Sequence, residues 1–211
     1  MTDLSQKLQE LRSLRGITRK ALADSTGLTV QALATYEKGF NTPPFETTRI
    51  LARFYNVDPK YLMGYEDSYV VKETENDCVV VSVLEKLPFG TPPKAVTSFS
   101  GSIAAKKSAI GKDSFVIRVN DSDLSPYLIK NDAVVVDAQV SPSDGDIVLA
   151  FTDKTCARFY FFSNEGDFVK LSYPPESEKA PVVIAKKELN KAGISIVGVA
   201  VSMVRNYGEE I

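Results

Sequence analysis

Histidine is absent from this chain of 211 residues, which excludes histidine-based catalytic triads and most metal sites that use imidazole. Cysteine is scarce: Cys78 and Cys156 lie far apart without a CxxC motif, so we expect reduced thiols and no disulfide framework. The chain has no apolar run of about eighteen residues and no signal-peptide pattern at its start. We therefore expect a cytoplasmic protein that uses neither a membrane span, a metal nor a cofactor.

Charge is distributed unevenly, although the net charge of the whole chain is only −2. Residues 1–62 carry nine Lys or Arg against six Asp or Glu, a net charge of +3, and the rest of the chain therefore has a net charge of −5. This asymmetry fits a local DNA footprint on the first segment without establishing one. The apolar content of 44% is sufficient for a packed core.

The first 62 residues show the periodicity of short helices. Leucines at positions 4, 8, 11 and 14 form one helical stripe, and Ala21, Leu22, Ile50, Leu51 and Phe54 are expected to face inward in later helices. Thr18 and Thr29 are favourable N-caps, and glycines follow the predicted helix ends. We predict helices over about 4–14, 18–25, 29–37, 45–55 and 59–62.

The pattern changes to β-strands in the second half of the chain. Runs of β-branched residues bounded by Gly, Pro, Asn and Asp are typical of strands. We predict a helical domain over 1–66, a linker over 67–80 and a mostly β domain over 81–211, with Lys72–Asp77 as the best linker segment. The clearest predicted strands are 115–119, 133–137, 146–151, 168–171 and 194–201.

Two of the predicted helices, 18–25 and 29–37, have the lengths and the short turn of a helix-turn-helix. If Leu33 faces the core, the helical period places Gln31, Thr35 and Lys38 on the opposite face. Gln can pair with an adenine edge, and Thr offers a hydroxyl and a methyl to bases. Without further information, a small helical bundle with a solvated polar face explains the same stripes.

A family resemblance favours the DNA-binding interpretation. The segment from Ile17 to Pro44 reads ITRKALADSTGLTVQALATYEKGFNTPP and resembles the helix-turn-helix of Xre/CI-type repressors. The resemblance covers residues 4–64 and implies that Val30, Gln31 and Thr35 contact bases, with Asn41 as a loop contact. Arg19 stands where the family often has Gln, which suggests a phosphate contact. The candidate DNA-binding residues are Arg19, Thr29, Val30, Gln31, Thr35, Lys38 and Asn41.

A second resemblance runs from about residue 83 to 206. Four segments are similar, in order and spacing, to the β domain of LexA/CI-type self-cleaving repressors. They read VLEKLPFGTPPKAV, FVIRVNDSDLSPYLIKNDAVVVD, SPSDGDIVLAFTDKTCARFYFF and IVGVAVSMVRN. The resemblance implies a twisted β fold that supports dimers, and a serine that attacks an Ala–Gly bond with a lysine as base.

The residues that this chemistry needs are different here. The serine position is Asp123, the lysine position is Arg158, and the cleavage position is Phe89–Gly90. A carboxylate is a poor nucleophile toward a peptide bond, and arginine stays protonated and cannot act as a base. We therefore expect a degenerate domain that is not an enzyme, with an ion pair between Asp123 and Arg158 in place of the dyad.

Alternatives to these site assignments stay open. The alternative is that Asp123 is a solvated turn residue and Arg158 an exposed strand residue. Ser122 and Ser125 flank the nucleophile position. A shift of one residue would rescue a serine there, and self-cleavage would then need Lys154, Lys170 or another base nearby.

The sequence thus predicts a dimeric, phage CI-like transcriptional repressor that binds an operator in double-stranded DNA. Because self-cleavage is expected to be lost, its induction requires another route, such as an antirepressor protein. The rival hypotheses are a self-cleaving repressor of the DNA-damage response, an antitoxin or adaptor that regulates its own gene, and a transcriptional activator.

Overall fold

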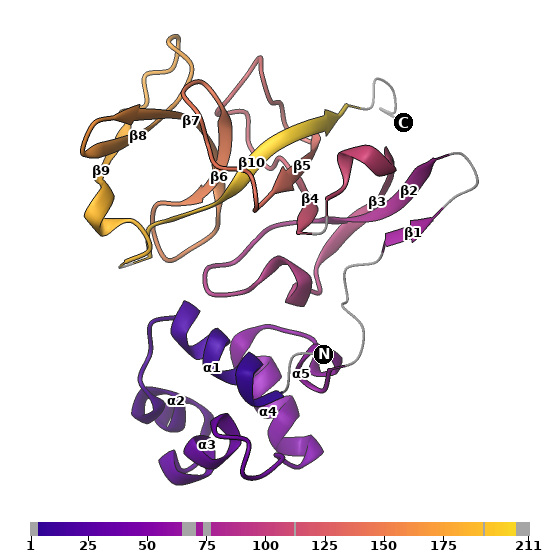
Figure 1. Ribbon diagram of the computed structural model, residues 1–211, viewed down its shortest axis with the longest axis vertical. Coiled ribbons are helices and arrows are strands. Elements are labelled where there is room, and N and C mark those ends of the chain that lie inside the picture. The colour runs from indigo at the N-terminus through magenta and orange to yellow at the C-terminus, as the bar shows by residue number, and fades with distance from the viewer. Residues whose placement is uncertain (1–3, 65–70, 74–76, 112, 192, 206–211) are drawn as a thin grey trace. The chain divides into compact units, whose positions relative to one another are not determined.

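The computed structural model describes residues 4–64, 71–73, 77–111, 113–191 and 193–205. These residues form two compact units (Figure 1). The helical unit contains residues 4–64 together with 89–97. The β unit contains the described residues from 71 to 88 and from 98 to 205.

The helical unit has the five α-helices that the periodicity predicts, within the described part of the chain. Thr18 and Thr29 cap α2 and α3 as expected, and Asp58 caps α5 through the Lys60 backbone amide. The helices are α1 (Leu4–Leu14), α2 (Arg19–Thr26), α3 (Val30–Glu37), α4 (Phe45–Tyr55) and α5 (Pro59–Leu62).

The core of the helical unit is built mainly from leucines on the inner faces of the helices, with Tyr55 fully buried among them. Three residues expected inside lie outside: Leu14 and Ile50 are exposed, and so is Ala21. The reason is helical geometry. Leu51, Ala52 and Tyr55 occupy the inner face of α4, so Ile50 points away from it.

The β unit consists of one sheet in which ten strands are described. Its strands are β1 (Val71–Glu73), β2 (Cys78–Leu84), β3 (Phe99–Lys106), β4 (Ser114–Arg118), β5 (Ala133–Asp137), β6 (Ile147–Phe151), β7 (Arg158–Glu165), β8 (Phe168–Ser172), β9 (Val182–Ala185) and β10 (Ser195–Val204). Short 3₁₀ helices, η2 (Lys107–Ala109) and η3 (Lys186–Glu188), follow β3 and β9, and a third, η1 (Pro93–Ala95), belongs to the helical unit.

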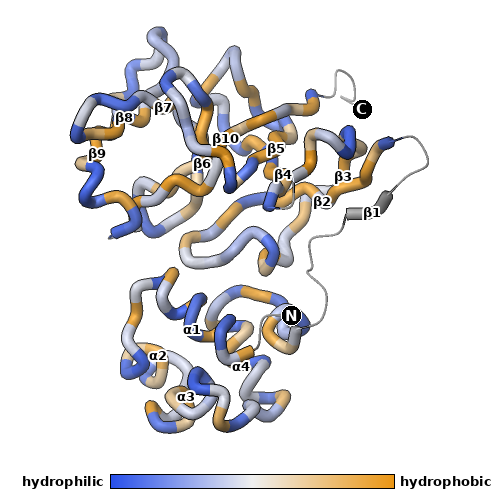
Figure 2. Tube along the Cα trace, in the orientation of Figure 1, coloured by the Kyte–Doolittle hydropathy of each residue, from blue (hydrophilic) through white to orange (hydrophobic). Residues whose placement is uncertain are grey.

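Strand β10 holds the β unit together, because it pairs antiparallel with β5 on one side and with β6 on the other (Figure 1). The order along the sheet is β1-β2-β4-β5-β10-β6-β7-β8-β9, and β3 also pairs with β2. Only the pairing of β2 with β4 is parallel among the described strands. Strands β4, β5 and β6 are buried along nearly their whole length, and their apolar runs are orange in Figure 2.

The five strands predicted most clearly are present as β4, β5, β6, β8 and β10. The predicted linker over 67–80 is too long, because β1 and the start of β2 lie within it and pair through Val71 and Val81. Residues 67–70 and 74–76 of that linker lie outside the described residues. Val71 and the valines of β2 thus lie in paired strands where the charged residues suggested a spacer.

Candidate nucleic-acid interface and residual cleft

The junction of α2 and α3 is fixed by capping and by buried leucines. The hydroxyl oxygen of Thr29 accepts a hydrogen bond from the Ala32 backbone amide at 3.1 Å, which satisfies one of the free amides at the start of α3. Gly27 turns the chain between the helices with φ of 72°, where glycine carries no steric penalty. Leu22 and Leu33 are buried at this corner. The two helices therefore have the arrangement of a helix-turn-helix.

The outer face of α3 carries accessible side chains. Val30 is 46% exposed, and Gln31, Lys38 and Asn41 are also exposed. Thr35 is half-buried, and its hydroxyl donates to the Ala32 carbonyl at 2.8 Å, so its methyl group and its oxygen lone pairs are what it can offer outward. Gln31 and Lys38 are thus exposed as the helical period predicts, whereas Thr35 is only partly accessible.

Arg19 has a structural contact that the sequence did not indicate. Its guanidinium pairs at 2.8 Å with the carboxylate of Glu37, which is only 1% exposed. Arg12 binds the other carboxylate oxygen at 2.7 Å, and this hydrogen bond is the main cause that raises the pKa of Arg12. The triad joins α1, α2 and α3, so Arg19 holds the helices together whatever it does toward DNA.

Phe40 is a candidate contact that the sequence analysis missed. It lies in the loop after α3 and is 73% exposed, the highest exposed fraction among the large hydrophobic residues that are described. The Lys38 ammonium lies 5.9 Å from the centre of its ring. An aromatic residue directly after Gly39 and before Asn41 was the available signal.

The β unit has a cleft with a volume of about 430 Å³. It contains the two positions that align with the serine and the lysine of self-cleaving repressors. Asp123 and Arg158 both line it, so the structure brings together the two residues that the resemblance aligned with the dyad. Its walls come from the end of β4 and the following turn, the start of β7, and two lysines. The lining residues are Lys86, Ile117, Arg118, Val119, Asn120, Asp121, Asp123, Leu149, Cys156, Ala157, Arg158, Phe159 and Lys179.

The expected ion pair between Asp123 and Arg158 is not the one that forms. The Asp123 carboxylate pairs instead with the Lys179 ammonium at 2.5 Å, and Lys179 also lies 5.3 Å from the centre of the Tyr173 ring. Burial raises the pKa of Tyr173 to about 12, with a smaller contribution from Tyr160. Lys179 was missed because it lies outside every motif quoted for the family.

The cleft offers no serine nucleophile among the described residues that line it. Ser122 and Ser125 are exposed and do not contribute to the lining. Neither Lys154 nor Lys170 lines the cleft, and Lys170 pairs with Glu165 at 3.4 Å. The one-residue shift therefore has no geometric support in this arrangement.

The segment at the expected cleavage position belongs to the helical unit. Pro88 still pairs with Cys156 in the β unit, whereas Phe89 and Gly90 begin the segment 89–97. Gly90 has φ of 72°, and a Cβ atom there would come within 2.4 Å of the Arg15 side chain. The Thr91 hydroxyl donates to the Tyr55 carbonyl at 3.4 Å. A close packing contact therefore requires glycine at position 90. The sequence analysis had assigned this glycine to a cleavage site.

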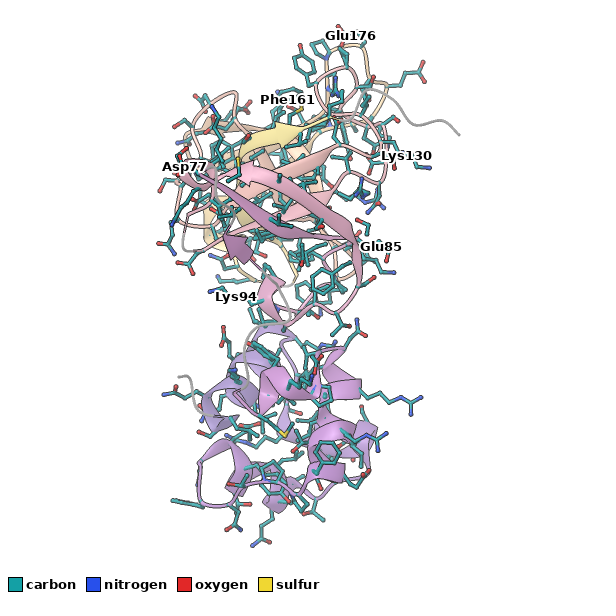
Figure 3. The ribbon with its side chains drawn as sticks, turned by 90° about the vertical axis from the view of Figure 1, so that its right-hand side faces the viewer. Asp77, Glu85, Lys94, Lys130, Phe161 and Glu176 are labelled. Atoms are coloured by element: carbon teal, nitrogen blue, oxygen red, sulfur yellow. The ribbon has the colours of Figure 1, made fainter. Side chains whose placement is uncertain are left out.

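The turn after β4 is held in place by Asp121 and by Asn120. The Asp121 carboxylate accepts a hydrogen bond from the Asp123 backbone amide at 3.1 Å. The Asn120 amide donates at 2.6 Å to the carbonyl of Glu85, the residue after β2 that is labelled in Figure 3. These bonds orient Asp123 toward the cleft.

None of the described helices is long and apolar enough to cross a membrane. No group of three or more Cys, Asp or Glu side chains in the described residues is placed to hold a metal ion.

The chain combines a helix-turn-helix unit with a β unit that has a cleft. This combination of units defines the class of protein. Residues 8–62 match the helix-turn-helix family model, and residues 82–201 match the peptidase S24-like family model. The chain belongs to the peptidase S24-like family, since that match covers more than half of its length.

Several regulators are similar to the chain. A LexA repressor of Geobacillus kaustophilus is 30% identical over 122 residues, 56% of this chain and 58% of the relative. The HTH-type transcriptional regulator ImmR of Bacillus subtilis is 30% identical over 84 residues, 40% of this chain and 65% of the relative. A LexA repressor of Caldicellulosiruptor saccharolyticus is 26% identical over 149 residues, 70% and 68% of the two chains. The chain thus spans less than two thirds of the first two relatives.

Proposed function

We propose that this protein is a sequence-specific DNA-binding repressor of the LexA and ImmR type. The observation that carries the proposal is the accessible outer face of α3 in a capped helix-turn-helix. The similarity to LexA repressors and to ImmR supports it, because those relatives are named as regulators. A helix presented in this way fits the major groove of DNA.

The side chains of the proposed interface divide into two groups. Val30, Gln31 and Thr35 read base edges, Val30 and Thr35 through methyl contacts and Gln31 through its amide. The positioning contacts come from Asn41, Lys38, the α3 N-terminus at Thr29, and the part of Arg19 that Glu37 leaves accessible. Affinity therefore depends on both groups, and sequence preference mainly on the first.

Two copies of the chain act together in this proposal. The β unit pairs two chains, and each helix-turn-helix then binds one half-site of a phage-type operator. Holding the second helical unit near the DNA raises its effective concentration, so weak half-site contacts give a tight complex.

The protein is proposed to remain intact instead of cleaving itself. Asp123 is engaged with Lys179 and is a poor nucleophile, and Arg158 cannot accept a proton. Release from the operator is therefore assigned to a partner such as an antirepressor protein. Purified protein kept at alkaline pH should stay a single chain, and fragments that meet at Phe89 and Gly90 would restore the self-cleaving alternative.

Footprinting on the DNA upstream of the protein's own gene tests the central proposal. Gln31→Ala should lose about 1–3 kcal/mol of binding free energy and relax the preference at one base position. Gln6→Ala is the matched control, since Gln6 is exposed on α1, outside the two helices of the helix-turn-helix. Equal losses for both variants, or a wild-type protein that protects no sequence, would overturn the proposal.

A further inference from the structure

The cleft of the β unit that Asp123 and Arg158 line carries a positive charge, although the chain after residue 62 is acidic overall. Cations from four separate segments line it: Lys86, Arg118, Arg158 and Lys179. The only carboxylates among its described lining residues are Asp121 and Asp123. The lining therefore has a net charge of +2, whereas the chain after residue 62 has a net charge of −5.

Two of the four positive charges are not matched by a carboxylate of the lining. Lys179 and Asp123 cancel one another. The Arg118 guanidinium donates to the Ser100 hydroxyl at 2.7 Å and to the Asn131 carbonyl at 2.9 Å, which fixes its position without removing its charge. Arg158 and Lys86 are exposed, and no ion pair within 4.0 Å is found for either among the described residues. The Asp153 carboxylate, which does not line the cleft, acts on Arg158 at longer range, and Arg158 helps to lower its pKa.

The floor of the cleft is apolar. Ile117 and Val119 lie at the end of β4, and Leu149 and Phe159 face one another in the pairing of β6 with β7. All four are buried. Cations above an apolar floor suit a ligand that has both carboxylates and hydrocarbon groups, and the volume falls in the range of about 300–1,000 Å³ of ligand clefts.

We propose that this cleft binds an extended acidic peptide segment of a partner protein, whose Asp or Glu side chains pair with Arg158 and Lys86. A compact anion needs donors that converge on one point, usually with backbone amides among them. Here the cations come from separate segments, so carboxylates at successive positions of one peptide can pair with each in turn. Arg158 supplies a planar fork that binds a carboxylate through two hydrogen bonds.

The inference deepens the proposed function and rests on it for its biological role, because it assigns the partner that releases the repressor to a defined surface. The degenerate site would thus have exchanged a catalytic lysine for an arginine that binds carboxylate. Peptide binding itself can be measured without DNA, so the two proposals are tested separately.

Tryptophan fluorescence gives a direct assay, because this chain of 211 residues contains no tryptophan. The probe is a short acetylated and amidated peptide of alternating glutamate and valine with a central tryptophan. We expect saturable binding that weakens by about tenfold in about 0.5 M salt, since the contacts are partly exposed ion pairs. The same peptide with glutamine in place of glutamate should not bind.

Charge reversal in the cleft should weaken binding selectively. Arg158→Glu and Lys86→Glu should each reduce the peptide affinity by about five- to tenfold, and the double variant by more than either alone. Lys187→Glu is the matched control: it makes the same change of net charge on an exposed lysine in η3, outside the cleft. If Arg158→Glu does not fold, as judged by thermal unfolding, Arg158→Gln should still weaken binding by about threefold.

The outcomes are distinct. Equal binding of the glutamate and glutamine peptides, or equal losses for Lys187→Glu and Arg158→Glu, overturns the inference. Complete competition by millimolar inorganic phosphate also overturns it, since the cleft would then be a small-anion site. Operator footprinting with wild-type protein in the absence of peptide tests the repressor proposal independently. Protection there together with no peptide binding rejects only the cleft assignment.

Discussion

Glu37 links the first three helices through its buried carboxylate. It is a nearly inaccessible carboxylate between two guanidinium groups, and the Gln9 side chain donates to its backbone carbonyl. Burying an ion pair costs solvation energy, so the net stabilisation from forming it is small. Removing one member is different, because the partner charges then remain partly buried without compensation.

We expect Glu37→Ala to lower the unfolding free energy of the helical unit by about 3 kcal/mol. Circular dichroism of the helices during urea unfolding measures this loss. Glu46→Ala is the control: Glu46 pairs with Arg49 on the surface at 3.2 Å and should matter by less than about 0.5 kcal/mol. Equal effects of the two substitutions would show that burial of Glu37 has no energetic consequence.

Asp132 makes the stability of the β unit depend on acid. Burial alone would raise its pKa, but hydrogen bonds from the Arg205 guanidinium and the Ile129 amide outweigh burial and hold the pKa below its ordinary value. Because the folded-state pKa is depressed, the stabilisation is complete above the unfolded value of about 3.9 and is lost as pH falls through the folded value.

We predict that wild-type protein loses unfolding free energy as Asp132 is protonated in acid. The Asp132→Asn variant should not show this part of the loss. The variant should be less stable than wild type at neutral pH, and the difference should shrink as the pH falls below about 4. Thermal unfolding at a series of pH values measures both curves. Parallel curves for the two proteins would assign the acid sensitivity to other carboxylates.

At the scale of elements, the N-terminus of α3 combines a stability role with a binding role that one substitution can separate. Thr29→Asp keeps the cap, because aspartate also accepts the Ala32 amide, so stability should change by less than about 0.5 kcal/mol. The added carboxylate would repel DNA phosphates and lower operator affinity by about tenfold or more. Thr29→Ala should instead cost about 1 kcal/mol of stability. If Thr29→Asp binds DNA with unchanged affinity, the N-terminus of α3 does not lie near the phosphate backbone of the DNA.

The junction of β10 with β5 depends on a glycine. A Cβ atom at Gly198 would lie 2.6 Å from the carbonyl oxygen of Asp137, too close for any real contact, and backbone cannot move aside easily. Gly198→Ala should therefore destabilise the β unit by about 2–3 kcal/mol. Calorimetry should show the loss, with Ser202→Ala, exposed on the same strand, as an unchanged control. A neutral Gly198→Ala would mean that the two strands separate at little cost.

The sequence predicted elements better than it predicted partners. Helix bounds followed from caps and the helical period, and β5 follows from an apolar run between turn residues, because these signals act over a few neighbouring positions. The pairing of Asp123 with Lys179 joins residues far apart in the chain, as does the burial of Glu37 between two arginines. Such contacts are decided by tertiary packing, so no local pattern could indicate them.

At the scale of the whole molecule, the proposed dimer makes a prediction about DNA geometry. Two helical units that bind one face of the duplex need half-sites separated by about one helical turn, near 10 base pairs, or by a multiple of it. Because the second unit binds at high effective concentration, removing one half-site should lower affinity by about 10²–10⁴-fold.

Helical phasing separates a true dimer from two independent chains. Inserting about five base pairs between the half-sites turns one of them to the opposite face of the duplex, so binding should fall nearly to the single-half-site level. Inserting about ten base pairs restores the face and should recover part of the affinity, limited by how far the two helical units can move apart. Gel-shift titration of the three operators with the full-length protein measures both steps. Equal affinity for all three would mean that each helix-turn-helix binds alone, and the β unit would then need a role other than pairing chains on DNA.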